Sequence, residues 1–133
     1  MGVKLLSVTE NLLQTVATAA RVCYSGLPVE ELLTRYSEEE QAELVKRVVG
    51  MGHLSVIEHG VMTLFADSSF KEELFRIMVE KPYLKITERE DGFIVSLNLR
   101  TAYELMEEMP HLRFVEELQK VYPAFLPKPK NQR

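Results

Sequence analysis

The strongest constraint on the fold is a predicted β-hairpin centred on Asp91 and Gly92. An Asp-Gly pair supplies the positive backbone angles of a tight primed turn. The flanking segments 84–89 and 93–97 are rich in β-branched and aromatic residues, a composition typical of strands. The chain is therefore expected to contain an antiparallel strand pair, and its sheet must accommodate that pair.

Hydrophobic patterning on either side of the hairpin predicts two more strands and about five helices. Ser37 with Glu40 has the spacing of a capping box. Ser69 with Glu72 has the same spacing, and Asn98 can cap the helix that follows the hairpin. The order of elements predicts an α/β (α+β) fold, in which a small, mostly antiparallel sheet packs with the helices. The expected strands are 3–8 and 61–65, and the expected helices are 12–24, 37–51, 70–81, 99–109 and 112–122.

Length and composition limit the class of protein. With 133 residues, of which 46% are hydrophobic, the chain is expected to form one domain around a single core. We place this domain at residues 1–125 and expect residues 126–133 to be a flexible tail rich in Pro and Lys. A net charge of −4 without clustered Lys and Arg argues against nucleic-acid binding. No apolar run approaches the roughly 20 residues of a membrane span.

Cys23 is the single cysteine, so no internal disulfide can form. It falls on the expected apolar side of the first helix, where a small buried thiol is the usual state. A reducing, cytoplasmic location is the expectation that follows, and the sequence shows no signal peptide.

The segment 52–59 concentrates polar side chains just after the expected end of a helix. His53, Ser55, Glu58 and His59 all lie within it. A plain helix-to-strand connection would be filled by ordinary turn residues, so we interpret the segment as a candidate functional site. The structural alternative is that His53 simply follows a helix C-cap, while Glu58 and His59 open the next element.

Three kinds of chemistry fit these side chains, and their spacing alone does not choose among them. A metal site would need a third His or Cys nearby and a standard ligand spacing, so we assign no metal. Nucleophilic catalysis by Ser55 lacks the glycines of a nucleophile elbow, so we assign no catalytic residue. A ligand-binding lining would use Ser55 for a phosphate or ribose, while the ring of His53 stacks or donates.

Asn98 and Arg100 form a second candidate, where the hairpin leads into a helix. An arginine in the first turn of a helix lies at the positive end of the helix dipole, so it suits a bound anion such as phosphate. The alternative is that Asn98 only caps the helix and Arg100 is solvated. Arg21 could serve a similar anion, and a surface salt bridge explains it equally well.

Three segments, taken together, resemble the N-terminal part of flavin-dependent thymidylate synthases. They are Val-Lys-Leu-Leu at 3–6, Val-Ala-Thr-Ala-Ala-Arg-Val-Cys-Tyr-Ser at 16–25 and Gly-His-Leu-Ser-Val-Ile-Glu-His at 52–59. The likeness extends over about residues 3–66 and resumes at 93–100, where a strand is followed by Asn-x-Arg. Each of the longer segments is a weak signal alone, but their combination at matching separation is specific.

The resemblance implies an α/β subunit in a homotetramer that binds FAD where subunits meet. Enzymes of this family methylate dUMP to dTMP with methylenetetrahydrofolate as carbon donor, and a reduced pyridine nucleotide such as NADPH delivers hydride through the flavin. The resemblance implies that Ser55 contacts FAD and that His53 and Glu58 belong to the same turn near the flavin. It implies that Asn98 and Arg100 hold the FAD from the other side.

The sequence departs from the family at its Arg-His-Arg signature, because residues 78–80 are Met-Val-Glu. The family segment that binds nucleotide phosphate is replaced by the hairpin at 83–96. The arginine that polarises the pyrimidine in the family should fall near Met109, whereas Arg113 lies roughly one helical turn away. Several cationic groups that the resemblance would place around the substrate are therefore missing from these positions.

These departures bear on function because the family reaction depends on orienting and polarising the substrate. We expect a shortened homologue that retains FAD or nucleotide binding at a subunit interface, as a dimer or tetramer, without full synthase activity. The alternative is a noncatalytic interaction or regulatory module derived from the same family.

Overall fold

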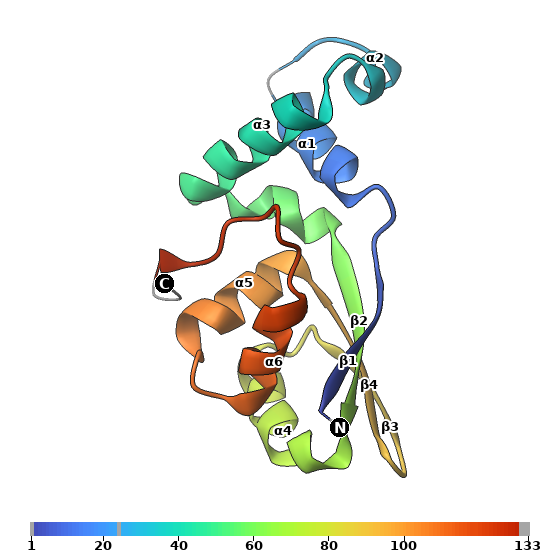
Figure 1. The fold of residues 1–133 in the computed structure, drawn as a ribbon, viewed down its shortest axis with the longest axis vertical. Helices are drawn as coiled ribbons and strands as arrows, with labels where there is room; N and C mark the ends of the chain where they lie inside the picture. Colours follow the sequence, from blue (N-terminus) through green and yellow to red (C-terminus); the bar gives the residue numbers. More distant parts are fainter. Residues whose placement is uncertain (1, 24, 131–133) are drawn as a thin grey trace.

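A four-stranded antiparallel sheet forms the centre of the fold, and its strands follow the order β1-β2-β4-β3 (Figure 1). A computed structural model describes residues 2–23 and 25–130. The two strands expected before the hairpin and the two expected within it are all present, so the predicted fold class is confirmed. The strands are β1 (Val3–Val8), β2 (Val61–Asp67), β3 (Lys85–Arg89) and β4 (Gly92–Asn98).

The helices form two groups around the sheet (Figure 1). One group gathers beyond one end of the sheet, at the top of the figure, and the other lies along its side. Within the part of the chain that is described, no helix is both long and apolar enough to cross a bilayer. The first group is α1 (Leu12–Val22), α2 (Val29–Thr34) and α3 (Glu38–Gly50); the second is α4 (Lys71–Glu80), α5 (Leu99–Glu108) and α6 (Arg113–Val121); short 3₁₀ helices are η1 (Leu54–His59) and η2 (Ser68–Phe70).

Alternation along β2 and β4 decides which face of the sheet is buried. Paired side chains on the inner face, such as Leu64 with Val95, are fully buried. On the outer face Thr63 and Ser96 pair through their hydroxyl groups at 2.8 Å, and Val61 is exposed. The expectation that both faces of this strand are covered is therefore wrong, because apolar and polar residues alternate with the pleat.

Two helix starts were correctly predicted from local chemistry. Ser37 Oγ accepts a hydrogen bond from the Glu40 backbone N–H at 3.1 Å, and Glu40 Oε1 accepts from the Ser37 N–H at 2.9 Å. Asn98 Oδ1 accepts from the Thr101 N–H at 2.8 Å and so caps α5. Both caps satisfy backbone donors that the helix itself leaves unpaired.

The hairpin is present, but its turn lies one residue earlier than predicted. Arg89 pairs with Gly92, so Glu90 and Asp91 form the loop. Asp91 does not have a positive φ angle, and Gly92 lies in β4 with φ of +159°. A Cβ on Gly92 would collide with the backbone oxygen of Ala66. This glycine is therefore needed for the close approach of β2 rather than for a primed turn.

Three further local predictions are corrected. The capping box expected at Ser69 is absent, because Asp67 accepts the Ser69 N–H at 2.9 Å and a 3₁₀ turn precedes α4. The segment 29–36, which has no clear pattern, contains the helix α2. Cys23 is exposed rather than buried, because α1 ends at Val22 and the thiol lies beyond its packed face. The predicted extension of this helix to Tyr24 lies outside the described residues.

The C-terminal segment remains in contact with the domain beyond residue 125. Leu126 and Pro129 are buried, and Leu126 belongs to the main hydrophobic core. The boundary at residue 125 and the flexibility of the tail remain predictions, and residues 131–133 lie outside the described part of the chain.

Gly60 allows η1 to pack directly against the start of α5. Its carbonyl oxygen accepts the Leu99 N–H at 2.9 Å. A Cβ at this position would lie 2.5 Å from Leu99 Cδ1 and 2.6 Å from Leu12 Cδ1, both in buried side chains. Only glycine therefore leaves room for this approach.

Lys81 ties the end of α4 to α5. Its Nζ donates to Glu104 Oε1 at 3.0 Å and to Glu108 Oε1 at 3.2 Å, and only 11% of its side chain is exposed. Burial alone would lower the pKa of Lys81, but the hydrogen bonds to the two carboxylates outweigh it and raise the pKa above the ordinary value.

We predict that Gly60→Ala destabilises the fold by about 1–3 kcal/mol, because the added methyl group overpacks two buried leucines. Urea denaturation monitored by circular dichroism measures this change. Gly50→Ala is the matched control, since no described atom lies within 4 Å of a Cβ built there. The control should stabilise α3 by about 0.4–1 kcal/mol. Equal effects of the two substitutions would contradict the packing argument.

We predict that the contribution of Lys81 to stability depends on pH in the alkaline range. The folded pKa is raised, so this contribution is fully present below the ordinary lysine pKa of about 10.4 and is lost as pH rises through the folded pKa. Lys81→Met should cost about 1–3 kcal/mol at neutral pH, because buried carboxylate oxygens lose their donor.

Urea denaturation of wild type and Lys81→Met at pH 7, 9 and 11 checks this prediction, and the difference in unfolding free energy should shrink at the highest pH. Tyr122 has a buried phenol whose pKa is also raised. It titrates in both proteins, so its effect cancels in the comparison. A difference that stays constant over the whole range would contradict the assignment.

Candidate functional site

The helix η1 presents polar side chains on its exposed face. Val56 and Ile57 are buried and anchor the turn in the core. Ser55 and Glu58 are exposed, and so is His53, which precedes the first turn without capping it through its side chain. The alternation of apolar and polar residues in this segment therefore separates an anchoring face from a face that is free to meet a ligand.

The start of α5 lies directly beside η1. The cap formed by Asn98 fixes where the helix begins, and the Leu99 N–H to Gly60 carbonyl bond sets its distance from η1. Arg100, the second residue of the helix, consequently reaches over to the exposed face of η1. The structure thus brings together, within one protomer, two segments that the sequence analysis singled out separately.

Arg100 forms ion pairs with two carboxylates. Its Nη1 donates to Glu58 Oε2 at 2.6 Å, and its Nε donates to Glu104 Oε2 at 3.3 Å. Exposed fractions of 41% for Arg100 and 44% for Glu58 leave both groups accessible from solvent. The hydrogen bond from Glu58 raises the pKa of Arg100 above its already high ordinary value. We refer to Glu58, Asn98, Arg100 and Glu104 as the acidic corner.

A cavity of about 380 Å³ opens at the acidic corner. The guanidinium supplies donors and the carboxylates supply acceptors. The Asn98 oxygen is committed to the helix cap, so the amide nitrogen is the group that it can offer to a ligand. Two carboxylates face one guanidinium, which leaves an excess of one negative charge. The cavity is lined by Glu58, Tyr83, Asn98, Arg100, Thr101 and Glu104.

This geometry changes the interpretation of Arg100. Its position in the first turn suggested that it needs an anion, and the structure supplies that negative charge from Glu58 and Glu104. Asn98 acts as the helix cap that the alternative interpretation proposed. The roles of both residues toward a cofactor remain predictions, and a ligand must be recognised by the paired groups together.

His53 and Ser55 do not line the cavity at the acidic corner. They lie on the same turn as Glu58 and face solvent. Across the described ranges 2–23 and 25–130, no three His, Cys, Asp or Glu side chains are grouped to hold a metal ion. The roles predicted for these two residues therefore remain predictions.

Sequence reasoning missed Tyr83 and Glu104 as parts of the site. Glu104 follows Arg100 by four residues, a spacing that brings side chains together on a helix, and this signal could have identified it. Tyr83 lies in the connection between α4 and β3, and nothing local in the sequence points to the cavity.

Arg113 is occupied elsewhere in the fold. Its Nη2 donates to the Ser69 carbonyl at 3.0 Å, and its guanidinium carbon lies 4.5 Å from the centre of the Phe70 ring. It does not line the cavity at the acidic corner. The doubtful equivalence between this residue and the substrate-polarising arginine of the family therefore gains no support from its position.

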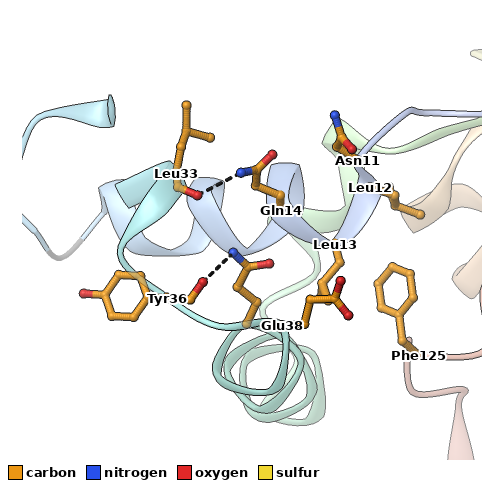
Figure 2. Close-up of a pocket in the computed structure, with 9 residues that line it drawn as sticks. Asn11, Leu12, Leu13, Gln14, Leu33, Tyr36, Glu38 and Phe125 are labelled. Carbon is orange, nitrogen blue, oxygen red and sulfur yellow. Dashed lines mark hydrogen bonds between the residues drawn. The ribbon is translucent and has the colours of Figure 1, made fainter. Parts of the chain in front are cut away.

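A second cavity, of about 520 Å³, lies beside α1 and contains none of the predicted site residues (Figure 2). Its two amide side chains are already bonded: Gln14 Nε2 donates to the Leu33 carbonyl at 2.8 Å, and Gln41 Nε2 donates to the Tyr36 carbonyl at 3.4 Å. These bonds hold the segment between α2 and α3 against α1, which is a structural role.

Comparison with known proteins identifies relatives of one kind. The family model described as thymidylate synthase complementing protein matches residues 4–76, more than half of the chain. Flavin-dependent thymidylate synthase of Clostridium tetani is 42% identical over 65 residues, which are 49% of this chain and 26% of the relative. The enzyme of the same name from Geobacter sulfurreducens is 33% identical over 63 residues, covering 47% of this chain and 27% of the relative.

A longer match extends past the hairpin. Flavin-dependent thymidylate synthase of Thermococcus onnurineus is 27% identical over 121 residues, which cover 83% of this chain and 49% of the relative. The chain thus spans from about a quarter to about half the length of these curated relatives. Since the family model covers most of the region that contains α1, α3 and η1, the chain belongs to the thymidylate synthase complementing protein family.

Proposed function

We propose that this domain binds FAD through the acidic corner. The observation that carries the proposal is the meeting of Glu58 with Arg100, at 2.6 Å, beside Asn98 in one cavity. Both segments are those that the sequence resemblance connects with the flavin. The relatives are named as flavin-dependent enzymes, which supports a flavin over other nucleotides.

The chemistry of the acidic corner fits the uncharged end of a flavin better than its diphosphate. The pyrimidine edge of the flavin ring alternates carbonyl acceptors with an N–H donor, and Arg100 with Glu58 offers the complementary donors and acceptors. A diphosphate would meet the excess negative charge of the two carboxylates. When bound, the flavin would supply hydride transfer from a reduced pyridine nucleotide such as NADPH, while the residues of the corner bind and orient the ring.

The site is proposed to be completed by a second copy of the chain. Ser55 and His53 are exposed beside the corner without lining its cavity, so they are available to a flavin held between subunits. On α4, Phe75, Met78 and Val79 expose a cluster of apolar surface, and Val79 is 83% exposed. Apolar clusters of this kind are typical of protein contacts. A homo-oligomer, either a dimer or a tetramer, is therefore part of the proposal.

We propose that the chain by itself does not methylate dUMP. At residues 78–80 the helix α4 exposes Met78, Val79 and an anionic Glu80, where the resemblance would place Arg-His-Arg. A cationic clamp on the substrate phosphate is therefore absent from that position. The apolar cluster on α4 also favours the second candidate function, an interaction module that pairs with another chain.

We predict that Ser55→Ala and Arg100→Ala each weaken FAD binding. Loss of a charge-assisted hydrogen bond at Arg100 should raise the dissociation constant about tenfold or more. Quenching of flavin fluorescence during titration of purified protein with FAD measures the affinity, and sedimentation velocity on the same samples reports the oligomer. Titration with dUMP, for which no binding is expected, separates flavin binding from substrate binding.

Arg89→Ala is the matched control for Arg100→Ala. Arg89 also forms a 2.6 Å ion pair with a carboxylate, Asp91, but it lies in the hairpin, and both partners are more than half exposed. The control should keep the FAD affinity of the wild type. Unchanged affinity in both site variants would refute the proposal, and absence of FAD binding by the wild type would favour the interaction module.

A further inference from the structure

A second cavity with two arginines lies between α1 and α3, away from the acidic corner. Arg21 on α1 and Arg47 on α3 line a cavity of about 440 Å³ together with Tyr36 and Ser25. Both arginines also line an adjoining hollow on the same surface. We call the group Arg21, Ser25, Tyr36 and Arg47 the arginine notch.

Arg21 is held rigidly in the arginine notch. Its guanidinium carbon lies 3.4 Å from the centre of the Tyr36 ring, so the planar group stacks on the aromatic face. In Figure 2 the Tyr36 ring points away from Gln14 and Leu13, while its carbonyl oxygen faces the Gln41 amide. The stacking fixes the direction of the guanidinium N–H groups before any ligand arrives.

The Nε–H of Arg21 is a buried donor with no hydrogen-bond partner among the described residues. A buried donor without an acceptor costs free energy, and such groups in folded proteins call for an explanation. Within the same described part of the chain, neither Arg21 nor Arg47 forms an ion pair within 4.0 Å. Two cationic groups with unused donors therefore share one cavity.

The carboxylates nearest to these arginines are engaged or set apart. Glu39, Glu40 and Glu43 line the adjoining hollow with Arg21 and Arg47. Glu40 accepts the backbone N–H of the α3 cap, so its carboxylate already has a structural partner. Glu43 lies one turn before Arg47 on α3 and is the group that competes with an added anion.

We propose that the arginine notch binds the phosphate group of a small phosphorylated ligand. The planar N–H groups of arginine match phosphate oxygens in bidentate geometry, and the stacked Arg21 is oriented in advance. The cavity volume leaves room for a sugar attached to the phosphate. This site is separate from the acidic corner and goes beyond the proposed flavin binding, because none of its residues lines the cavity at Arg100.

The test uses titration of the full chain with inorganic phosphate and then with ribose 5-phosphate. The Arg21 Nε–H resonance in ¹H–¹⁵N NMR spectra should shift during both titrations, because this donor gains an acceptor. By isothermal titration calorimetry, Arg47→Ala should weaken binding about tenfold, as expected for loss of a charge-assisted contact. Glu43→Gln should strengthen it, since a competing carboxylate is removed.

Two controls decide between a built site and general electrostatics. Arg35→Ala removes the same charge from the neighbouring segment, where Arg35 is more than half exposed and does not line the notch. It should leave phosphate affinity unchanged. Equal weakening by Arg35→Ala and Arg47→Ala, or no shift of the Arg21 resonance, would overturn the proposal. Binding of the dicarboxylate glutarate as tightly as phosphate would overturn the assignment of the ligand class.

Discussion

The close approach of η1 to α5 at Gly60 is the constraint on which the candidate site depends. A single backbone hydrogen bond, from the Leu99 N–H to the Gly60 carbonyl at 2.9 Å, joins the two elements. The absence of a side chain at Gly60 lets two buried leucines fill the space around it. Arg100 follows Leu99 directly, so this packing sets the position from which its guanidinium reaches Glu58.

The acidic corner then follows from charge and from its setting at the surface. Arg100 is shared between Glu58 and Glu104, and Glu104 is shared in turn with Lys81. A network of this kind holds its members in fixed directions, although each exposed pair contributes little stability by itself. The excess negative charge disfavours a phosphate at this position and favours a neutral group with alternating donors and acceptors. The arginine notch has the opposite character, with two cationic side chains and an unused buried donor.

Local chemistry in the sequence predicted most of the fold, whereas contacts between distant segments were beyond it. The caps at Ser37 and Asn98 depend on neighbours within three residues and were predicted correctly. The turn at Asp91 was placed one residue late, because pairing along the whole of β2 draws Gly92 into the strand. The pairing of Arg100 with Glu58 spans 42 positions, so sequence could suggest both residues but not their contact.

A double-mutant cycle on FAD binding tests most directly whether the acidic corner acts as one unit. Glu58→Gln and Arg100→Gln are each compared with the wild type and with the double variant by measuring the dissociation constant for FAD. If the two side chains orient the flavin together, their effects are not additive, and the coupling free energy is about 0.5–3 kcal/mol. Additive effects of the two substitutions would contradict the account.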